Sequence, residues 1–181
     1  MELFDLYTAD REKTGKTMVR GEHTPEGYYR LVIHVCIFND QGQMLIQQRQ
    51  PFKSGWSNLW DVSVGGSAVA GDTSRSAAER ETREELGLSI DLTDVRPSLT
   101  IYWEHGFDDF YLLNLTPDLN ELHLQHEEVQ RVCWADMDEI MRMIDDGRFI
   151  PYDKSLIGLL FFRRDHRGCQ TRKDDTVPAP V

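Results

Sequence analysis

Residues 80–88 read Arg-Glu-Thr-Arg-Glu-Glu-Leu-Gly-Leu, a short stretch that combines glutamates with arginines. It closes the segment 73–86, which lacks Gly and Pro and is rich in Ala, Glu and Arg. This composition favours an α-helix, and Gly87 is of the residue type that most often follows one. We therefore expect a helix over 73–86 whose N-terminal cap is Asp72, Thr73 or Ser74.

The three glutamates of this helix share one narrow face. At about 100° per residue, Glu84 and Glu85 lie roughly 60° behind and 40° ahead of Glu81. Like charges at this spacing destabilise a helix by roughly 0.2–0.5 kcal/mol per pair, which salt bridges with Arg80 and Arg83 can offset. The face is either an ordinary solvated surface or a set of carboxylates held together for a cation.

Glycines precede the helix at positions that a cation site would need. Gly65 and Gly66 allow close approach to the backbone, and Gly71 permits a sharp turn into the helix. Carboxylates, backbone carbonyls and water are the ligands of a hard cation such as Mg²⁺, which commonly bridges to substrate phosphates. The loop and the helix are therefore predicted to form one oxygen-only site on which the three carboxylates converge.

Outside this helix, apolar runs alternate with turns. The nearly continuous apolar run 31–38 and the run 44–49, separated by Asn39-Asp40-Gln41-Gly42, predict two strands joined by a turn. Residues 1–30 are polar and turn-rich and predict a short strand or two. Further strands are expected at 59–64, 98–103, 107–116 and 129–134, and further helices near 136–146 and 153–164.

This mixed order of strands and helices predicts an α/β or α+β fold. We expect one domain over 31–162, with residues 1–30 as an N-terminal extension packed on it. Residues 163–181 carry several charges and end Val-Pro-Ala-Pro-Val, which predicts a flexible tail.

Composition excludes several classes of protein. The chain of 181 residues has 31 acidic residues against 20 Lys plus Arg, a formal net charge of -11 that repels duplex nucleic acid. No stretch approaches the roughly 18 apolar residues of a membrane helix, and Met1–Asp5 lacks the features of a signal peptide. Three widely spaced cysteines suggest neither disulfides nor zinc, so a reducing, cytoplasmic location is predicted.

Taken together, Gly66, Asp72 and residues 80–88 resemble the Nudix box, G-x5-E-x7-R-E-U-x-E-E-x-G-U, with every spacing kept. Asp72 replaces the first Glu of the pattern, and Thr82 stands where an aliphatic residue is usual. Asp72 keeps the carboxylate and a good helix cap, and the β-branched Thr82 can pack its methyl group inward. Neither change removes a candidate cation ligand.

The resemblance implies a Nudix fold, with a mixed β-sheet sandwiched between α-helices. It also implies hydrolysis of a diphosphate linkage in a small nucleoside-diphosphate-X compound with Mg²⁺, or with Mn²⁺ in its place. Partners other than this small molecule are not implied, although a homodimer is compatible with the family. By position, the implied cation ligands are Glu81, Glu84 and Glu85 with the backbone of Gly66, and Arg80 is the residue that orients a glutamate.

The general base stays open at this stage. In the family it is either the first glutamate of the Arg-Glu pair, here Glu81, or a carboxylate on a downstream loop, here Glu127 or Glu128. Glu128 is the preferred additional catalytic residue and ligand, and the competing interpretation makes both ordinary loop acids.

Residues 3–160 further resemble the Nudix branch that includes isopentenyl-diphosphate isomerase. Aligned through Trp60, the isomerase cysteine falls on Gly65, so the catalytic thiol is missing and hydrolysis fits better than isomerisation. Arg49 and Lys53 occupy positions that bind diphosphate in that branch, and Arg30 is a further candidate for substrate binding. A surface pair at the end of a strand is the competing interpretation of Arg49 and Lys53.

One alternative hypothesis, from another functional class, is a Nudix domain that senses a ligand or binds a protein without catalysis. The third hypothesis is an isomerase. The spacing of His105, His123, His126 and His166 does not match that of metal ligands. His34, inside the apolar run, is expected to be a hydrogen-bonded residue of the core or the sheet rather than a ligand.

Overall fold

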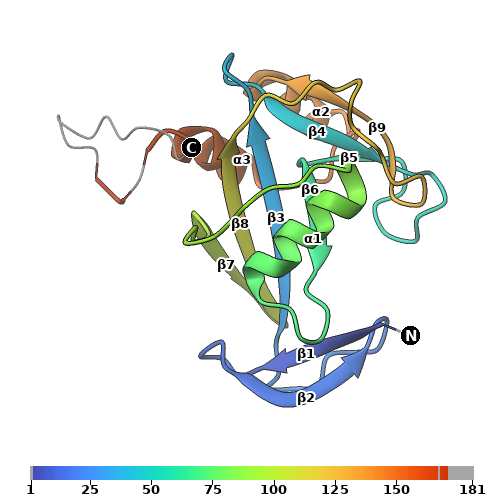
Figure 1. The fold of residues 1–181 in the computed structure, drawn as a ribbon, viewed down its shortest axis with the longest axis vertical. Coiled ribbons are helices and arrows are strands. Elements are labelled where there is room, and N and C mark those ends of the chain that lie inside the picture. The colour runs from blue at the N-terminus through green and yellow to red at the C-terminus, as the bar shows by residue number, and fades with distance from the viewer. Residues whose placement is uncertain (1, 167, 171–181) are drawn as a thin grey trace.

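The computed structural model describes residues 2–166 and 168–170 (Figure 1). In this part of the chain there are nine strands and three helices. The strands are β1 Leu3–Tyr7, β2 Lys13–Val19, β3 Arg30–Phe38, β4 Met44–Arg49, β5 Trp60–Asp61, β6 Val64–Ser67, β7 Leu99–Trp103, β8 Gly106–Asn114 and β9 Val129–Ala135. The helices are α1 Ser74–Leu86, α2 Met137–Asp145 and α3 Lys154–Arg163. None of the helices in the described residues has the length and apolar character needed to span a membrane.

The central sheet is mixed, as the sequence predicts. Its strand order is β5-β4-β3-β8-β7, with β6 paired to β3 and β9 paired to β4. The long apolar strand β3 runs parallel to β8 from Arg30↔Gly106 to Phe38↔Asn114 and antiparallel to β6. Residues 3–19 form a separate two-stranded sheet, β1-β2, which joins β3 through the bridge between Tyr7 and Tyr29.

The strand expected at 59–64 is wrong as a single element, because the chain divides it into β5 and β6. Ser63 lies between the two strands, donates a hydrogen bond to the backbone oxygen of Leu45 and accepts one from the amide of Ile37. Its side chain therefore bridges β4 and β3. This is the point at which the chain leaves β4, where β5 pairs, and joins β3, where β6 pairs.

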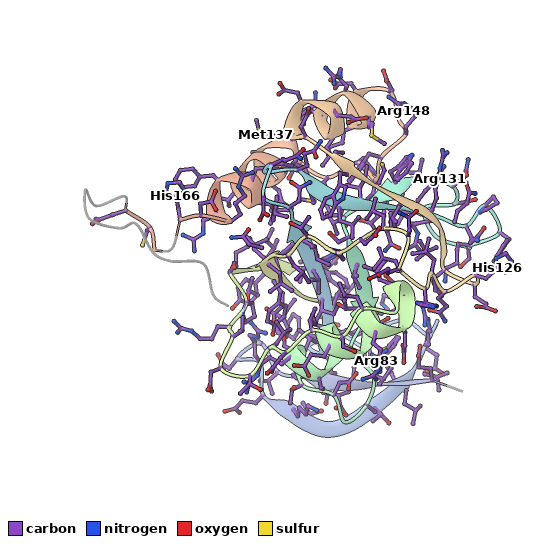
Figure 2. All side chains as sticks on the ribbon, turned by 45° about the horizontal axis from the view of Figure 1, so that its top comes forward. Arg83, His126, Arg131, Met137, Arg148 and His166 are labelled. Carbon is purple, nitrogen blue, oxygen red and sulfur yellow. The ribbon has the colours of Figure 1, made fainter. Side chains whose placement is uncertain are left out.

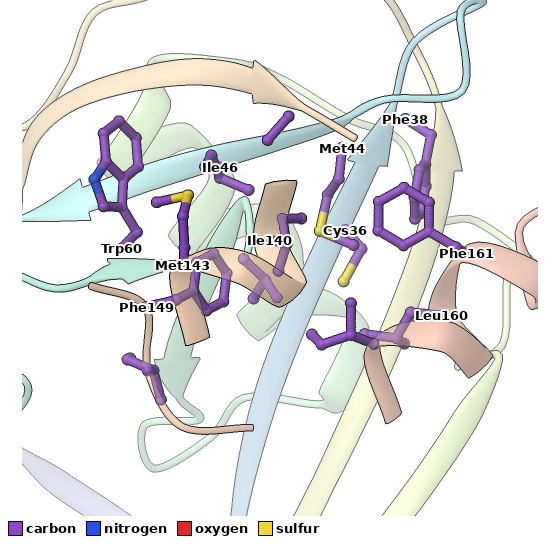
Figure 3. Close-up of a cluster of buried hydrophobic side chains, with 14 of the residues drawn as sticks. Cys36, Phe38, Met44, Ile46, Trp60, Ile140, Met143, Phe149, Leu160 and Phe161 are labelled. Carbon is purple, nitrogen blue, oxygen red and sulfur yellow. The ribbon is translucent and has the colours of Figure 1, made fainter. Parts of the chain in front are cut away.

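Alternation along β3 places two apolar clusters on opposite faces of the sheet. Ile33, Val35 and Ile37 face α1, where they pack with Ala77, Ala78 and Leu86. Cys36 and Phe38 face the side covered by α2 and α3 (Figure 1). Figure 3 shows this second cluster, in which Ile140 and Met143 of α2 and Leu160 and Phe161 of α3 meet Met44 and Ile46 of β4. The predicted arrangement of a sheet between helices is confirmed.

Helix α1 begins and ends close to where the sequence predicts. Thr73 is the N-cap, and its hydroxyl accepts a hydrogen bond from the amide of Ser76, whose side chain in turn accepts from the amide of Thr73. Gly87 closes the helix in the left-handed conformation with φ of 68°. Thr82 is fully buried, as expected, and its hydroxyl donates to the carbonyl of Ala78.

The structure describes nearly all of the predicted N-terminal extension, residues 1–30, but less than half of the predicted tail, residues 163–181. Residues 1–30 contain the β1-β2 sheet, whose buried side chains Phe4, Leu6 and Met18 form a small cluster with Tyr28 and Val69. Most of the predicted tail, residues 171–181, lies outside the described residues.

Candidate active site

The carboxylate Glu81 lies directly against the backbone of Gly66. A Cβ atom placed on Gly66 would come within 2.3 Å of Glu81 Cδ and 2.5 Å of Glu81 Oε1. A side chain at this position would push the Glu81 carboxylate out of its present place. The pairing of β6 with β3 through Ile33↔Gly66 fixes this glycine beneath α1.

Arg80 binds several acidic side chains at once. Its guanidinium donates to Asp72 Oδ2 at 2.8 Å, Glu81 Oε1 at 2.9 Å and Glu84 Oε2 at 3.0 Å. It also donates to the carbonyl oxygen of Ser67 at 3.3 Å, so it connects α1 to the end of β6. Asp72, considered as a helix cap in the sequence, serves instead as a partner of Arg80, because Thr73 occupies the cap position.

Glu85 is the most deeply buried of the three glutamates, with 3% of its surface exposed. Burial, together with the neighbouring charges of Glu81 and Glu128, raises its pKa to about 8, although a hydrogen bond from Gln47 opposes the rise. That bond joins Gln47 Nε2 to Glu85 Oε2 at 2.9 Å. Burial also raises the pKa of Glu81.

Sequence reasoning missed Gln47 as a residue of the site. It occupies an apolar strand and is 1% exposed, and its Oε1 atom is buried without a hydrogen-bond partner in the described residues. Gln47 and Gln48 are consecutive glutamines in a run of buried residues, and a buried amide needs a hydrogen-bond partner. This was the signal in the sequence that could have identified Gln47. The sequence alone does not say that the partner is Glu85.

The expected convergence of the three carboxylates is not found in the side-chain arrangement. Within residues 2–166 and 168–170, no group of three or more His, Cys, Asp or Glu side chains is placed to hold a metal ion. The reason is that Arg80 holds Glu81 and Glu84, whereas Gln47 holds Glu85. The donor set still fits a hard cation chemically, since the hydrogen bonds from Arg80 and Gln47 engage only one oxygen of each carboxylate.

Glu128 lies on a loop that is fastened to the end of α1. The amide of Gln125 donates to the carbonyl oxygen of Glu85, and the amide of Gln50 donates to that of Glu128. Lys53 Nζ lies 2.5 Å from Glu128 Oε1. Glu127, the other candidate, is exposed, and Figure 2 shows the preceding His126 at the outer tip of this loop. The structure therefore brings Glu128 and Lys53 together beside Glu85, whose pKa the charge of Glu128 helps to raise.

The other two candidate substrate contacts lie in different surroundings. Arg49 stands at the end of β4, and its Nε donates to the carbonyl oxygen of Gly55 at 3.2 Å in the loop that carries Lys53. Arg30 lies at the start of β3, with its guanidinium over the rings of Phe4 and Trp103. Burial lowers the pKa of Arg30, and the charge of Asp108 opposes this effect. Among the described residues, the ion pairs of Glu81 and Glu84 are made by Arg80 and not by Arg30.

The expectation that His34 is a hydrogen-bonded core residue is wrong in one respect. The ring is buried, with 8% exposed, and stacks on Phe110 with ring centroids 4.4 Å apart. Both ring nitrogens, however, lack a hydrogen-bond partner in the described residues. The nearest charged group, Asp108 Oδ2, is 3.8 Å from Nε2, which is too long for a hydrogen bond.

Comparisons with known proteins identify the family of the chain. A family model described as the NUDIX domain matches residues 28–153. The chain therefore belongs to the Nudix family.

Individual relatives show which members of the family the chain is similar to. The chain is 49% identical over 152 residues to a protein of Listeria monocytogenes named as an uncharacterized Nudix hydrolase, covering 84% of this chain and 90% of that protein. It is 26% identical over 150 residues to the isopentenyl-diphosphate Delta-isomerase of Shigella flexneri, covering 77% and 80%. A crystal structure of a Deinococcus radiodurans protein superposes with a TM-score of 0.69 at 26% identity, covering 88% of this chain and 97% of that one. The distant similarity to the isomerase is thus confirmed alongside a nearer similarity to Nudix hydrolases.

Proposed function

We propose that the protein is a Mg²⁺-dependent hydrolase that cleaves a diphosphate linkage in a small nucleoside-diphosphate-X compound. The observation that carries this proposal is the contact between Glu81 and Gly66, with Glu85 buried on the same helix and Arg80 joining the elements. These residues occupy the matching positions of the Nudix box. Mn²⁺ is expected to substitute for Mg²⁺ because both accept the same oxygen ligands.

Glu81, Glu84 and Glu85, with the carbonyl oxygen of Gly66, would hold the cation. When bound, it would neutralise diphosphate charge and lower the pKa of water. The chain itself supplies the negative charge of these carboxylates and holds them in fixed positions. Arg80 restrains Glu81 and Glu84 in the absence of the cation. Gln47 orients Glu85 through a single hydrogen bond.

For the general base, Glu81 and Glu128 both remain candidates, and Glu128 is preferred over Glu127. The side chain of Glu128 is partly buried beside Lys53, whereas Glu127 is exposed. Lys53 would exchange its contact with Glu128 for a phosphate oxygen of the substrate, leaving the carboxylate free to accept a proton. Arg49 would bind the same diphosphate from the adjoining loop, and Arg30 is a candidate contact for a more distant part of the substrate.

Isomerase activity is disfavoured by the chemistry of the described residues. Gly65 stands where the isomerase thiol falls in the alignment. The nearby Cys36 is fully buried, and burial raises the pKa of its thiol well above the usual range. A thiol in that state is a poor acid–base group for an allylic substrate.

The experiment is a substrate screen with purified protein and Mg²⁺. The panel contains dinucleotides, nucleotide sugars and nucleoside di- and triphosphates, with release of phosphate or monophosphate as the readout. Hydrolysis of at least one class supports the proposal. Nanomolar binding of a nucleotide without turnover would favour the non-catalytic sensing module instead, and conversion of isopentenyl diphosphate to its dimethylallyl isomer would favour the isomerase.

A further inference from the structure

A cavity of about 1210 Å³ lies at the N-terminal end of α1. It is lined by the first turn of this helix, by residues 91–98, by strands β7 and β8 and by the end of α3. The three glutamates of the Nudix box are not among its lining residues. Figure 2 shows His166, which lines the cavity, and His126, on the loop that carries Glu128, at opposite sides of the molecule. The cavity is therefore separate from the candidate active site.

The cavity gathers positive charge in an acidic protein. Its lining contains five arginines and three aspartates, although the whole chain has 31 acidic residues against 20 Lys plus Arg. The arginines come from the turn between β1 and β2, from α1, from the segment before β7 and from the end of α3: Arg11, Arg75, Arg96, Arg163 and Arg164. A guanidinium group keeps its charge at physiological pH and binds the oxygens of phosphate in a bidentate manner.

Part of this charge is already used within the protein. Asp109 is fully buried, and it accepts hydrogen bonds from Arg11 and from the hydroxyl of Thr100, both at 2.6 Å. The other two aspartates of the lining are exposed. Arg164 is paired with Asp165 at 2.7 Å. Arg11 and Arg164 therefore have anionic partners of their own.

The remaining arginines of the lining form no ion pair in the part of the chain that the structure describes: Arg75, Arg96 and Arg163. Arg163 donates to the backbone carbonyl oxygens of Ser98 and Gly168, which do not compensate its charge. Arg75 and Arg96 are exposed. The positive charge of these three side chains is thus available to an anion that enters the cavity.

The first turn of α1 adds further donors. Acidic side chains are favoured at this end of a helix because of the helix dipole, yet the first turn of α1 has no acidic residue and carries Arg75. The hydroxyl of Thr73 caps the amide of Ser76, whereas the amides of Ser74 and Arg75 have no acceptor in the described residues. Arg75 is unfavourable for the helix by itself, and an anion bound at this end would make it favourable.

We propose that this cavity binds a small molecule that carries several phosphate groups and is distinct from the diphosphate substrate. Typical ligand pockets have volumes of roughly 300–1,000 Å³, so a single phosphate would leave most of this larger cavity empty. Arginines from separate segments can bind several phosphate groups of one molecule, and the amides of the first turn of α1 can bind another oxygen. The site is independent of the proposed hydrolase activity, because none of the candidate catalytic residues lines it.

The test is calorimetric titration of the full chain with inorganic tripolyphosphate, in EDTA and about 0.15 M NaCl to screen non-specific attraction. Wild-type protein should bind one tripolyphosphate per chain, and inorganic phosphate should bind at least about tenfold more weakly. The double variant Arg75→Ala/Arg96→Ala should weaken tripolyphosphate binding at least about tenfold, the effect of losing one hydrogen bond to a charged group. Its thermal unfolding should not shift to a lower temperature, because Arg75 is unfavourable for the helix, and this separates lost binding from lost folding.

The matched control is Arg83→Ala/Arg142→Ala, which removes the same charge from exposed positions of α1 and α2 outside the cavity and should bind as the wild type does. Absence of saturable binding to the wild type, equal affinity for phosphate and tripolyphosphate, or equal losses in the two double variants would overturn the proposal. A loss in Arg49→Ala/Lys53→Ala that the cavity variant does not show would place tripolyphosphate in the candidate active site and would also overturn it. Hydrolysis in the substrate screen is a separate measurement, so the proposed function can fail or stand independently of these results.

Discussion

Glu81 of α1 and Gly66 of β6 fit together so closely that a methyl group on the glycine would lie 2.3 Å from the carboxyl carbon of the glutamate. The contact places the Glu81 carboxylate against the backbone of a glycine that is 15 residues earlier in the chain. It joins the loop and the helix of the Nudix box into one unit.

Gly66→Ala should therefore displace Glu81 and lower kcat/KM by about 10- to 100-fold, since small misplacements of catalytic groups have effects of that size. The measurement is steady-state hydrolysis beside thermal unfolding. Gly158→Ala in α3, where an added Cβ meets nothing within 4 Å, is the control and should raise stability by roughly 0.5–1 kcal/mol without changing activity. Full activity in Gly66→Ala would show that the contact has no catalytic role.

Arg80→Lys tests whether the guanidinium fork is needed. A lysine keeps the positive charge but cannot bind Asp72, Glu81 and Glu84 in the same geometry, so stability should fall by about 1–3 kcal/mol and activity should fall as well. Chemical denaturation and kinetics report the two effects. Arg83→Lys, an exposed change on the same helix, should have little effect on either, and equal behaviour of the two variants would contradict this role for Arg80.

Gln47→Leu removes the hydrogen bond to Glu85 while keeping a side chain of similar size. Glu85 would lose the bond that favours its charged form, so Mg²⁺ should bind about 10- to 100-fold more weakly, the usual effect of removing a group that orients a ligand. Calorimetric titration with Mg²⁺ measures this directly. Gln48→Leu is the control, because Gln48 points to the opposite face and binds Asn58 and Arg131. Unchanged Mg²⁺ affinity in Gln47→Leu would argue against its role.

Stability in the presence of a chelator should depend on pH through Glu85. Its pKa is about 8 in the folded chain and near 4.5 when unfolded, so the folded state binds the proton more tightly. The resulting stabilisation is complete below about pH 4.5 and is lost as the pH rises to about 8. Thermal unfolding of wild type and Glu85→Gln with EDTA should show a decline over this range that is smaller in the variant. Parallel curves for the two proteins would contradict the assignment.

Much of the fold follows from local patterns in the sequence. The apolar run in β3, the Gly-free segment that becomes α1 and the glycine that ends it are all read within a few residues, and each is confirmed. The spacing of the Nudix box likewise predicts which carboxylates share a helix face. The division of the strand at 59–64 could not be read in this way, because it depends on Ser63 bonding to two other strands.

The candidate site was less accessible to sequence reasoning for the same physical reason. Gln47 and Glu85 are 38 residues apart and meet only because the fold brings this residue of β4 to the C-terminal end of α1. The hold of Arg80 on Glu81 and Glu84 is local to α1, but its bond to the carbonyl oxygen of Ser67 joins separate elements. The burial of His34 against Phe110, with both ring nitrogens unpartnered in the described residues, likewise arises from packing between distant segments. The residue types indicate the chemistry of the site, but tertiary structure decides which of its polar atoms form hydrogen bonds with one another.

The most direct measurement of the central claim is hydrolysis of the best substrate from the screen by wild type and Glu85→Gln, both with Mg²⁺. We expect the variant to fold with an unchanged circular dichroism spectrum and to lose at least about 100-fold in kcat/KM, because the proposed buried cation ligand is replaced by an amide. A folded Glu85→Gln protein that hydrolyses the substrate at the wild-type rate would contradict the assignment of this helix as the catalytic element.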